Sequence, residues 1–454
     1  MRRIKSDLLH GVIWQQLLLF FFPVLFGTIF QQLYNTMDAI IVGRIVGKQA
    51  LAAVGGSTAT IINLILGFLV GLSSGTTVVV AQCYGNQDYL KVHRSVSTGI
   101  VLAIGLGFAL TIVGELIAPS LLLALHVPMD IYPYALTYLR IYLLGLIPSL
   151  IYNTGSGILR AVGDSKRPLY FLIAACLTNI AFDILFVGVF HWGIAGAAIA
   201  TIIAQIISCL MTLSVLRHAE FAYRFRFKKI TFDFEILKQI LIIGFPTGIQ
   251  SSLYSFANMF VQSRINTFGT DTVAAYTAFG TIDAFYWNTT GALGTAVLTF
   301  SGQNFGAGKI ERVKKGFFQA IGLFLAISVI IMTICGLFGD DLFRLFTNDT
   351  KVIAIGTSIL YYLFRFWPAF CLVEIFSSGM RACGDSLVPM LMTVFGIGVL
   401  RILWILFYPA QDLFGILKIY PITWAFTSLL FGLYYLQGGW LKRSLKRRQR
   451  LIAE

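Results

Sequence analysis

The chain has 454 residues, of which 57% are hydrophobic and only 12% are charged, and its mean hydropathy is +0.81. An average globular domain carries roughly 25% charged residues, so this composition excludes an ordinary soluble protein and a disordered chain. The net charge is +14, from 34 Lys and Arg against 20 Asp and Glu. Such an excess indicates a protein that binds nucleic acid or one that lies at a membrane surface. The position of the basic residues along the chain decides between the two.

Apolar stretches of about 20 residues or more, long enough to cross a bilayer, recur along the whole sequence. We predict twelve spans, six in each half of the chain, with no cleavable signal peptide before the first. The first six are centred on 17–41, 52–80, 95–118, 132–157, 168–190 and 194–216. The second six are centred on 238–263, 273–301, 316–338, 352–378, 387–409 and 416–440.

The basic residues are unevenly divided between the loops. The two ends of the chain and one alternate set of connections carry 25 Lys and Arg, whereas the opposite set carries 6. By the positive-inside rule, this bias predicts a multi-pass protein of the cell membrane with both termini in the cytoplasm. The charge excess then reflects topology, so the expected partner is the lipid bilayer and not nucleic acid.

The two halves of the chain resemble each other. The nine residues Arg160–Pro168 recur as Arg381–Pro389 with six identities. Other landmarks keep offsets of 221 to 223 residues, namely Pro23 with Pro246, Asn35 with Asn258, Ala52 with Ala274, and Gln82 with Gln303. These matches predict two six-helix repeats, at 1–225 and 226–441, followed by a basic cytoplasmic tail at 442–454.

An even number of spans gives both repeats the same orientation in the membrane. We therefore predict an all-α membrane protein of twelve transmembrane helices, arranged as two pseudo-symmetric lobes around a central cleft. Transporters built from repeats bind substrates and coupling ions near the midplane between them. A duplicated helical bundle without a transport role is the alternative, and polar residues inside the spans argue against it.

Acidic and polar residues gather in three spans of the first half. Asp38 lies late in the first span, Asn179 and Asp183 share one face of the fifth, and Thr201 follows small residues in the sixth. An Asp at a helix centre costs roughly 2.5–3.5 kcal/mol on insertion, so each needs a partner, a proton or a use. Their oxygens suit a hard monovalent cation. The two carboxylates could instead take up a proton. Alternatively each acid is neutralised separately, with Arg140 available to one of them.

The second half does not repeat this group. Asn258 and Val261 stand where the first half has Asn35 and Asp38, and Trp404 stands at the offset of Asp183. Two other acids inside the spans, Asp283 and Glu374, form a candidate polar site. Glu374 shares a helix face with Arg381, seven residues later, which favours a structural or gating ion pair over a coupling role.

A candidate substrate cavity is indicated by polar and aromatic residues at membrane depth. Gln31, Tyr34 and Asn35 lie in the first span, between Pro23 and Asp38, and Asn153 lies in the fourth. Rings and amides suit a lipophilic organic cation, and polar groups at this depth need a wet or paired site.

The chain resembles the multidrug and toxic compound extrusion (MATE) transporters. The resemblance rests on the two six-helix halves, the duplicated Arg-Ala-x-Gly-Asp-Ser-x-x-Pro motif, the segment Asp38–Gly43 and the Asn179-x-x-x-Asp183 spacing. It implies export of cationic amphipathic organic compounds in exchange for Na+ or H+. It also implies that Asp38, Asn179, Asp183 and Thr201 bind the coupling ion. Pro23 would be a bend in the first helix.

One family feature is not matched. Another branch places an acidic ion site in the seventh and tenth helices, but the polar residues of the seventh span here are Gln250, Asn258 and Gln262. A C-terminal ion site would then fall to Asp283 or Glu374.

Other functions share parts of this pattern. A lipid-linked oligosaccharide or other polar-lipid flippase of the same wider superfamily shares the two-lobe plan, but we would expect a more basic cavity for a pyrophosphate. A transporter of the major facilitator superfamily would carry a Gly-rich basic motif between the second and third spans. This motif is absent here. We expect no enzyme and no cofactor besides the coupling ion, because the sequence shows no metal, triad or nucleotide motif. We also expect a monomer.

Overall fold

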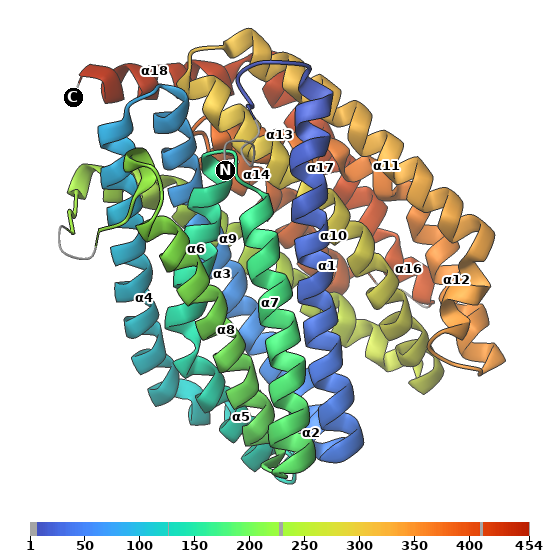
Figure 1. The fold of residues 1–454 in the computed structure, drawn as a ribbon. Helices are drawn as coiled ribbons and strands as arrows, with labels where there is room; N and C mark the ends of the chain where they lie inside the picture. The colour runs from blue at the N-terminus through green and yellow to red at the C-terminus, as the bar shows by residue number, and fades with distance from the viewer. Residues whose placement is uncertain (1–6, 126, 227–229, 409–411, 454) are drawn as a thin grey trace. The chain divides into compact units, whose positions relative to one another are not determined.

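The computed structural model describes residues 7–125, 127–226, 230–408 and 412–453. Across these residues the chain forms helices and no strand, as predicted (Figure 1). Ten helices are long and apolar enough to cross a membrane, and a bent pair, Tyr132–Leu144 with Leu146–Ala161, is an eleventh span with a bend of 49°. The predicted span 273–301 lies within the 37-residue helix Thr270–Gly306, whose Thr, Asn and Gln residues make it more polar. With this helix, the described chain matches the twelve predicted spans.

The chain divides into two compact units, each described here by itself. Unit 1 contains Phe22–Gly248, and unit 2 contains Leu8–Phe21 and the chain from Ile249 onward. The change of unit therefore falls inside the first helix of each repeat, shortly before Pro23 and shortly after Pro246. The predicted division at 225 and 226 concerns the sequence repeat and remains a prediction.

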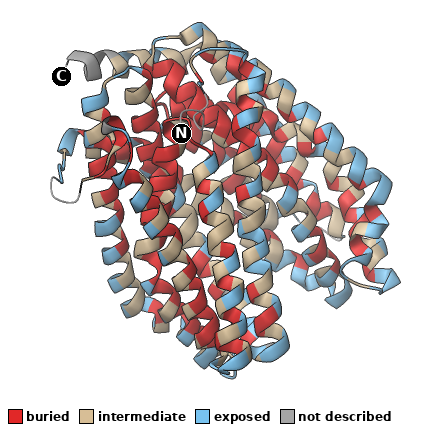
Figure 2. Cartoon of the chain, viewed as in Figure 1, coloured by how far each residue is buried: buried red, intermediate tan, exposed pale blue. Residues whose placement is uncertain are grey.

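Unit 1 contains eleven helical segments. They are α1 (Ile13–Ile45) from Phe22 onward, α2 (Lys48–Gly55), α3 (Ser57–Gly85), α4 (Tyr89–Ala124), α5 (Tyr132–Leu144), α6 (Leu146–Ala161), α7 (Lys166–Asp183) with a π-helical turn η1 (Ile184–Val189), α8 (Gly193–Arg217) with a 3-10 turn η2 (Phe221–Tyr223), and the first half of α9 (Phe234–Ile265). The span predicted at 168–190 is thus α7 continued by η1. Large apolar side chains such as Leu116 on α4 and Leu177 on α7 are exposed, as expected for lipid-facing helices. Figure 2 shows exposed residues along the length of the helices.

Unit 2 repeats this plan with more breaks. It contains the start of α1 and the rest of α9, then η3 (Asn266–Phe268), α10 (Thr270–Gly306), α11 (Ile310–Arg344), α12 (Thr350–Leu363), η4 (Phe364–Phe370), α13 (Cys371–Ala382), α14 (Leu387–Thr393), η5 (Val394–Val399), α15 (Leu400–Phe407), α16 (Leu413–Leu417), α17 (Ile419–Gln437) and α18 (Gly439–Ala453). The last helix carries the basic tail.

The duplicated motif is a helix stop followed at once by a helix start. Gly163 and Gly384 have φ of 92° and 97°, a conformation that glycine adopts readily and other residues rarely do. The amide nitrogens of Asp164 and Asp385 donate to the carbonyl oxygens of Leu159 and Met380, at 2.9 and 3.0 Å. The two copies therefore make the same turn with the same hydrogen bonds, which gives their shared sequence a structural cause.

Within unit 1, α3 and the first half of α9 meet backbone to backbone. A Cβ atom added to Gly75 would lie 2.3 Å from the carbonyl oxygen of Ile240, and one added to Gly71 would lie 2.5 Å from the amide nitrogen of Gly248. A Cβ atom added to Gly244 would likewise lie 2.5 Å from the carbonyl oxygen of Leu72. Small residues allow such close helix packing in a membrane, and no side chain fits between these backbones.

We predict that Gly75→Ala lowers the thermal stability of the purified protein, whereas Gly105→Ala does not. The new methyl group of Gly75→Ala would force α3 and α9 apart, at a cost of about 1–3 kcal/mol. Gly105 on α4 has no neighbour within 4 Å of an added Cβ, and alanine is preferred in a helix by roughly 0.5–1 kcal/mol. Thermal unfolding in one detergent would compare the two variants. Equal melting temperatures would contradict the close contact.

Candidate functional site

Four polar residues predicted from the sequence are buried in unit 1, and we call them the acid cluster. Asp38 comes from α1, Asn179 and Asp183 from the end of α7, and Thr201 from α8. Their exposed fractions are 4%, 0%, 0% and 1%. Asp183 is the last residue of α7 before the wider turns of η1, and the carboxyl groups of Asp38 and Asp183 interact electrostatically. The structure thus brings these groups from three helices into one region.

Most oxygens of the acid cluster have no hydrogen-bond partner within the described chain. This holds for Asp38 Oδ1, both carboxylate oxygens of Asp183 and Asn179 Oδ1, while Thr201 Oγ1 has only the Tyr34 hydroxyl facing it. The other carboxylate oxygen of Asp38, Oδ2, accepts one long hydrogen bond, of 3.4 Å, from the Tyr138 hydroxyl. Burying polar groups unsatisfied costs about 1–3 kcal/mol each, and more when they are charged. These oxygens therefore fit a cation or protons as their missing partner.

No basic side chain supplies that partner among the described residues. Arg140, the base considered for this role from the sequence, instead forms an ion pair with Glu115, with 3.6 Å between Nε and Oε2. The alternative in which Arg140 neutralises an acid of the cluster is therefore wrong. An oxygen set of two carboxylates, an amide and a hydroxyl suits a hard cation such as Na+, and the carboxylates alone suit a proton.

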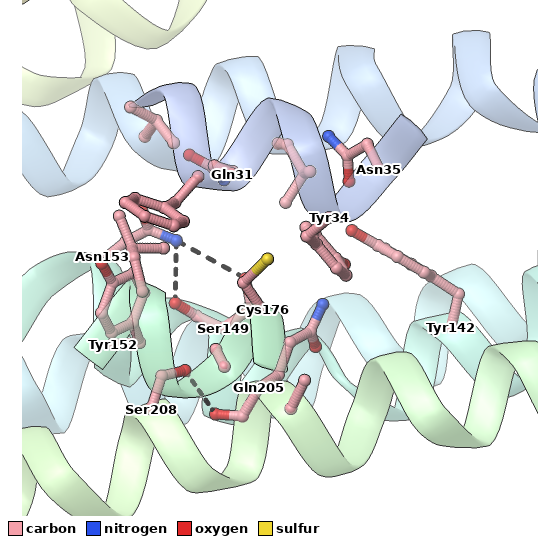
Figure 3. Close-up of a pocket in the computed structure, with 16 residues that line it drawn as sticks. Gln31, Tyr34, Asn35, Tyr142, Ser149, Tyr152, Asn153, Cys176, Gln205 and Ser208 are labelled. Carbon is pink, nitrogen blue, oxygen red and sulfur yellow. Dashed lines mark hydrogen bonds between the residues drawn. The ribbon is translucent and has the colours of Figure 1, made fainter. Parts of the chain in front are cut away.

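A pocket of about 110 Å³ lies in unit 1 (Figure 3). All four residues proposed from the sequence line it: Gln31, Tyr34 and Asn35 from α1, and Asn153 from α6. Figure 3 shows Gln31, Tyr34 and Asn35 along one helix, with Asn153 across the cavity, where its Nδ2 donates to the carbonyl oxygen of Ser149 at 2.9 Å.

Tyrosines connect the pocket to the acid cluster. Tyr34 lines the pocket and interacts electrostatically with Asp38 and Asp183, and its hydroxyl faces Thr201. Tyr142 from α5 also lines the pocket and interacts with Asp38. A charged group in the pocket would therefore interact electrostatically with the carboxylates across one layer of aromatic side chains.

Several pocket residues were missed by the sequence reasoning. They are Tyr142 from α5, Ser149 and Tyr152 from α6, Cys176 from α7, and Gln205 and Ser208 from α8. A signal existed on α8, because Gln205 and Ser208 follow Thr201 at helical spacing on the same face. No signal marked Tyr142, since Tyr138 and Tyr142 lie in a span rich in aromatic residues.

The two acids proposed as a polar site in unit 2 have separate partners. Asp283 on α10 accepts hydrogen bonds from the indole nitrogens of Trp287 and Trp367, at 2.8 and 3.1 Å. Glu374 on α13 accepts from Ser378, whose hydroxyl in turn accepts from Arg381 at 3.2 Å.

Glu374 and Arg381 also line a pocket of about 360 Å³ in unit 2, together with Tyr254 and Trp287. No pattern in the sequence predicts these two aromatic residues beside Glu374 and Arg381. Asp283 does not line this pocket, although Trp287, which donates to it, does.

Comparisons with known proteins agree with this architecture. The model of the MatE family matches the chain twice, over residues 23–185 and 246–406. The probable multidrug resistance protein YpnP of Bacillus subtilis (strain 168) is 31% identical, over 96% of this chain and 97% of that protein. The probable multidrug resistance protein NorM of Thermotoga maritima is 25% identical over 94% of this chain and 93% of that protein.

Solved structures share the fold. An outward-facing multidrug resistance MATE family transporter of the MOP superfamily has a TM-score of 0.88 at 23% identity, with 97% of this chain and 98% of that chain covered. A crystal structure of MATE in the bent conformation has a TM-score of 0.87 at 23% identity, with 97% of this chain and 99% of that chain covered. At these identities the structural match establishes the fold alone.

We predict that Asp183→Asn raises the thermal stability of the purified protein when no small metal cation is present. At alkaline pH, with choline as the only added cation, the substitution removes one of two buried like charges, a gain of roughly 1–3 kcal/mol. The matched control is Asp164→Asn, also buried in unit 1, whose carboxylate pairs with Arg167 at 3.3 Å and accepts from its amide. The control should lower stability by roughly 1–3 kcal/mol. A fall of similar size for both variants would contradict an unsatisfied cluster.

Proposed function

The chain belongs to the MatE family of multidrug efflux transporters, and from that premise we propose that it exports cationic amphipathic organic compounds in exchange for Na+ or H+. One observation carries the proposal: a buried set of carboxylate, amide and hydroxyl oxygens, most of them without protein partners, lies next to a pocket lined by rings and amides. The first feature calls for a cation and the second for an amphipathic molecule.

Coupling follows from charge. When the acid cluster holds no ion, its two carboxylates give the pocket a negative potential that favours a cationic substrate. Binding of Na+ or a proton lowers that negative charge and weakens the attraction, so the substrate leaves. Ion and substrate then have opposed affinities for the two states of the carrier, which is the thermodynamic requirement for exchange. Tyr34, which contacts both regions, is the side chain through which one event reaches the other.

The pocket suggests how a substrate is held. Tyr34, Tyr142 and Tyr152 offer aromatic faces to a cation, while Gln31 and Asn153 offer amide groups to polar substituents. Its volume of about 110 Å³ is smaller than the roughly 300–1,000 Å³ that enclose a drug-sized ligand. In this conformation the pocket would therefore receive one end of a substrate, and the helices around it would have to separate for the rest.

The choice of ion depends on which oxygens take part. A proton needs only the carboxylates of Asp38 and Asp183, whereas Na+ needs several oxygen ligands and would also use Asn179 Oδ1 and Thr201 Oγ1. Pro23, inside α1 and 15 residues before Asp38, remains our candidate for a bend that accompanies release. Its missing amide hydrogen weakens the helix there.

The setting of this function is a multi-pass position in a lipid bilayer. We propose both termini on the cytoplasmic side, from the distribution of basic residues, and a monomer as the working unit. The flippase alternative is not favoured, because the relatives reported above are described as multidrug resistance proteins.

We predict that Asp38→Asn and Asp183→Asn each abolish drug efflux while the protein still reaches the membrane. Each variant removes a charge that differs between the loaded and unloaded states, and coupling energies of this kind correspond to roughly 5- to 150-fold in affinity. Accumulation of a fluorescent organic cation in cells, with a blot of the membrane fraction, measures both effects. Glu115→Gln is the control, because this acid is paired with Arg140. Normal efflux in both Asp variants would disprove the proposal.

We further predict that the neutral ligands Asn179 and Thr201 are needed for efflux driven by Na+ but not for efflux driven by protons. In proteoliposomes, efflux is driven separately by a Na+ gradient and by a pH gradient. If the Na+ gradient drives efflux, Asn179→Ala with Thr201→Val should reduce that efflux roughly 10- to 100-fold, as expected for lost ligands. If only the pH gradient drives it, the same variant should retain most activity. Undiminished Na+-driven efflux in this variant would contradict the ligand assignment.

A further inference from the structure

Unit 2 contains a buried positive charge that the proposed cycle does not use. Arg401, on α15, is 0% exposed. Its Nη1 donates to Asn258 Oδ1 at 2.6 Å, and its Nε donates to Thr423 Oγ1 at 3.4 Å. Arginine keeps its proton in proteins, so this charge is permanent.

Aromatic rings complete the surroundings of this guanidinium. Its central carbon lies 4.4 Å from the ring centre of Tyr420 and 5.1 Å from that of Tyr254. Tyr420 is held by a hydroxyl contact of 2.8 Å with Tyr276. Asp283 interacts with Arg401 electrostatically, but no carboxylate of the described chain lies within ion-pair distance of it. The site holds this cation with an amide oxygen, a hydroxyl oxygen and two π faces, and its second terminal nitrogen, Nη2, is buried without a hydrogen-bond partner.

The repeat places Arg401 within one residue of the position that matches Asn179, because the offset of 221 that pairs Asp183 with Trp404 pairs Arg401 with Ile180. An offset of 222 relates Asn179 to Arg401 and Thr201 to Thr423, and an offset of 223 relates Asn35 to Asn258. These offsets lie within the range of the other landmarks of the repeat. The three helices that build the acid cluster in unit 1 therefore correspond to the three that surround Arg401 in unit 2.

The two corresponding sites have opposite charge. In unit 1 buried oxygens of Asp38, Asp183 and Asn179 lack partners, and no base lies among them. In unit 2 the first carboxylate is replaced by Val261, which is buried and shares a helix face with Asn258, and the oxygens of Asn258 and Thr423 accept from Arg401. The cation that the oxygens of unit 1 would take from solution has its counterpart in unit 2 in the guanidinium of Arg401.

We propose that the guanidinium of Arg401 is a tethered cation that fills the ion position of the second repeat. This inference rests on the proposed role of the acid cluster in ion coupling. A cation that cannot dissociate cannot be exchanged, and it repels a second cation from the same place. Ion coupling then runs through unit 1 alone, at one site per cycle, and Arg401 is the residue that keeps unit 2 from binding the ion.

Ion binding to the purified full-length protein tests this directly. Thermal stability is measured in NaCl against choline chloride of equal concentration, and again across a pH series, because a ligand that binds the folded state stabilises it as its concentration rises. With Arg401 intact, the D38N/D183N variant should lose all saturable stabilisation. Adding V261D and R401N to that background rebuilds an acid, an amide and the Thr423 hydroxyl in unit 2, and should restore it. Adding V261D alone should not, since the new carboxylate pairs with Arg401.

The possible results separate this inference from the proposed function. Saturable stabilisation that persists in D38N/D183N would overturn the tethered cation, because unit 2 would then bind the ion itself. An absence of any ion effect in the wild-type protein would overturn ion coupling at the acid cluster. The comparison of V261D/R401N with V261D would still test Arg401, and no gain in a monodisperse V261D/R401N protein would count against it. R401K, which keeps the charge, should behave like the wild-type protein and checks that charge is what matters.

Discussion

A hydrocarbon layer accepts no hydrogen bonds, and this constraint shapes the molecule at every level. Backbone groups meet it by forming helices, in which each amide donates to a carbonyl of the same segment. Side chains meet it in pairs, as Arg140 does with Glu115 and Asp283 with two indoles. The acid cluster is a place where the described chain does not supply partners for two buried carboxyl groups. A transport protein needs such a binding site, because polar groups already paired within the chain would have no affinity for a transported ion.

The duplicated chain shows which features must be copied and which are free to diverge. The turn at Gly163 and Gly384 is kept in both halves because it sets where two helices end and begin. The polar residues between the helices are not kept, and the positions that hold Asp38 and Asn179 in one unit correspond to Val261 and Arg401 in the other. Duplication has thus preserved the scaffold while the chemistry of the two units has separated.

Much of the fold was predictable because hydropathy and repetition act along the chain. The twelve spans needed only the length of apolar runs, and the repeated turn needed only Gly and Asp at a fixed spacing. The depth of Asp38, Asn179, Asp183 and Thr201 inside apolar helices likewise marked them before any contact was known. The partner of Arg140 was not predictable, since Glu115 lies 25 residues away and only packing decides which acid the guanidinium reaches. The π-helical turn after Asp183 had no signal in the local sequence.

The glycine contact between α3 and α9 has a mechanical consequence. Helices that touch through their backbones have no rotamers to rearrange at the contact, so they cannot slide past each other in small steps as helices with interdigitating side chains do. The start of α9, up to Gly248, must move as one solid piece with α3. Flexing of this helix is thereby left to the residues that follow Gly248, where the chain passes into unit 2.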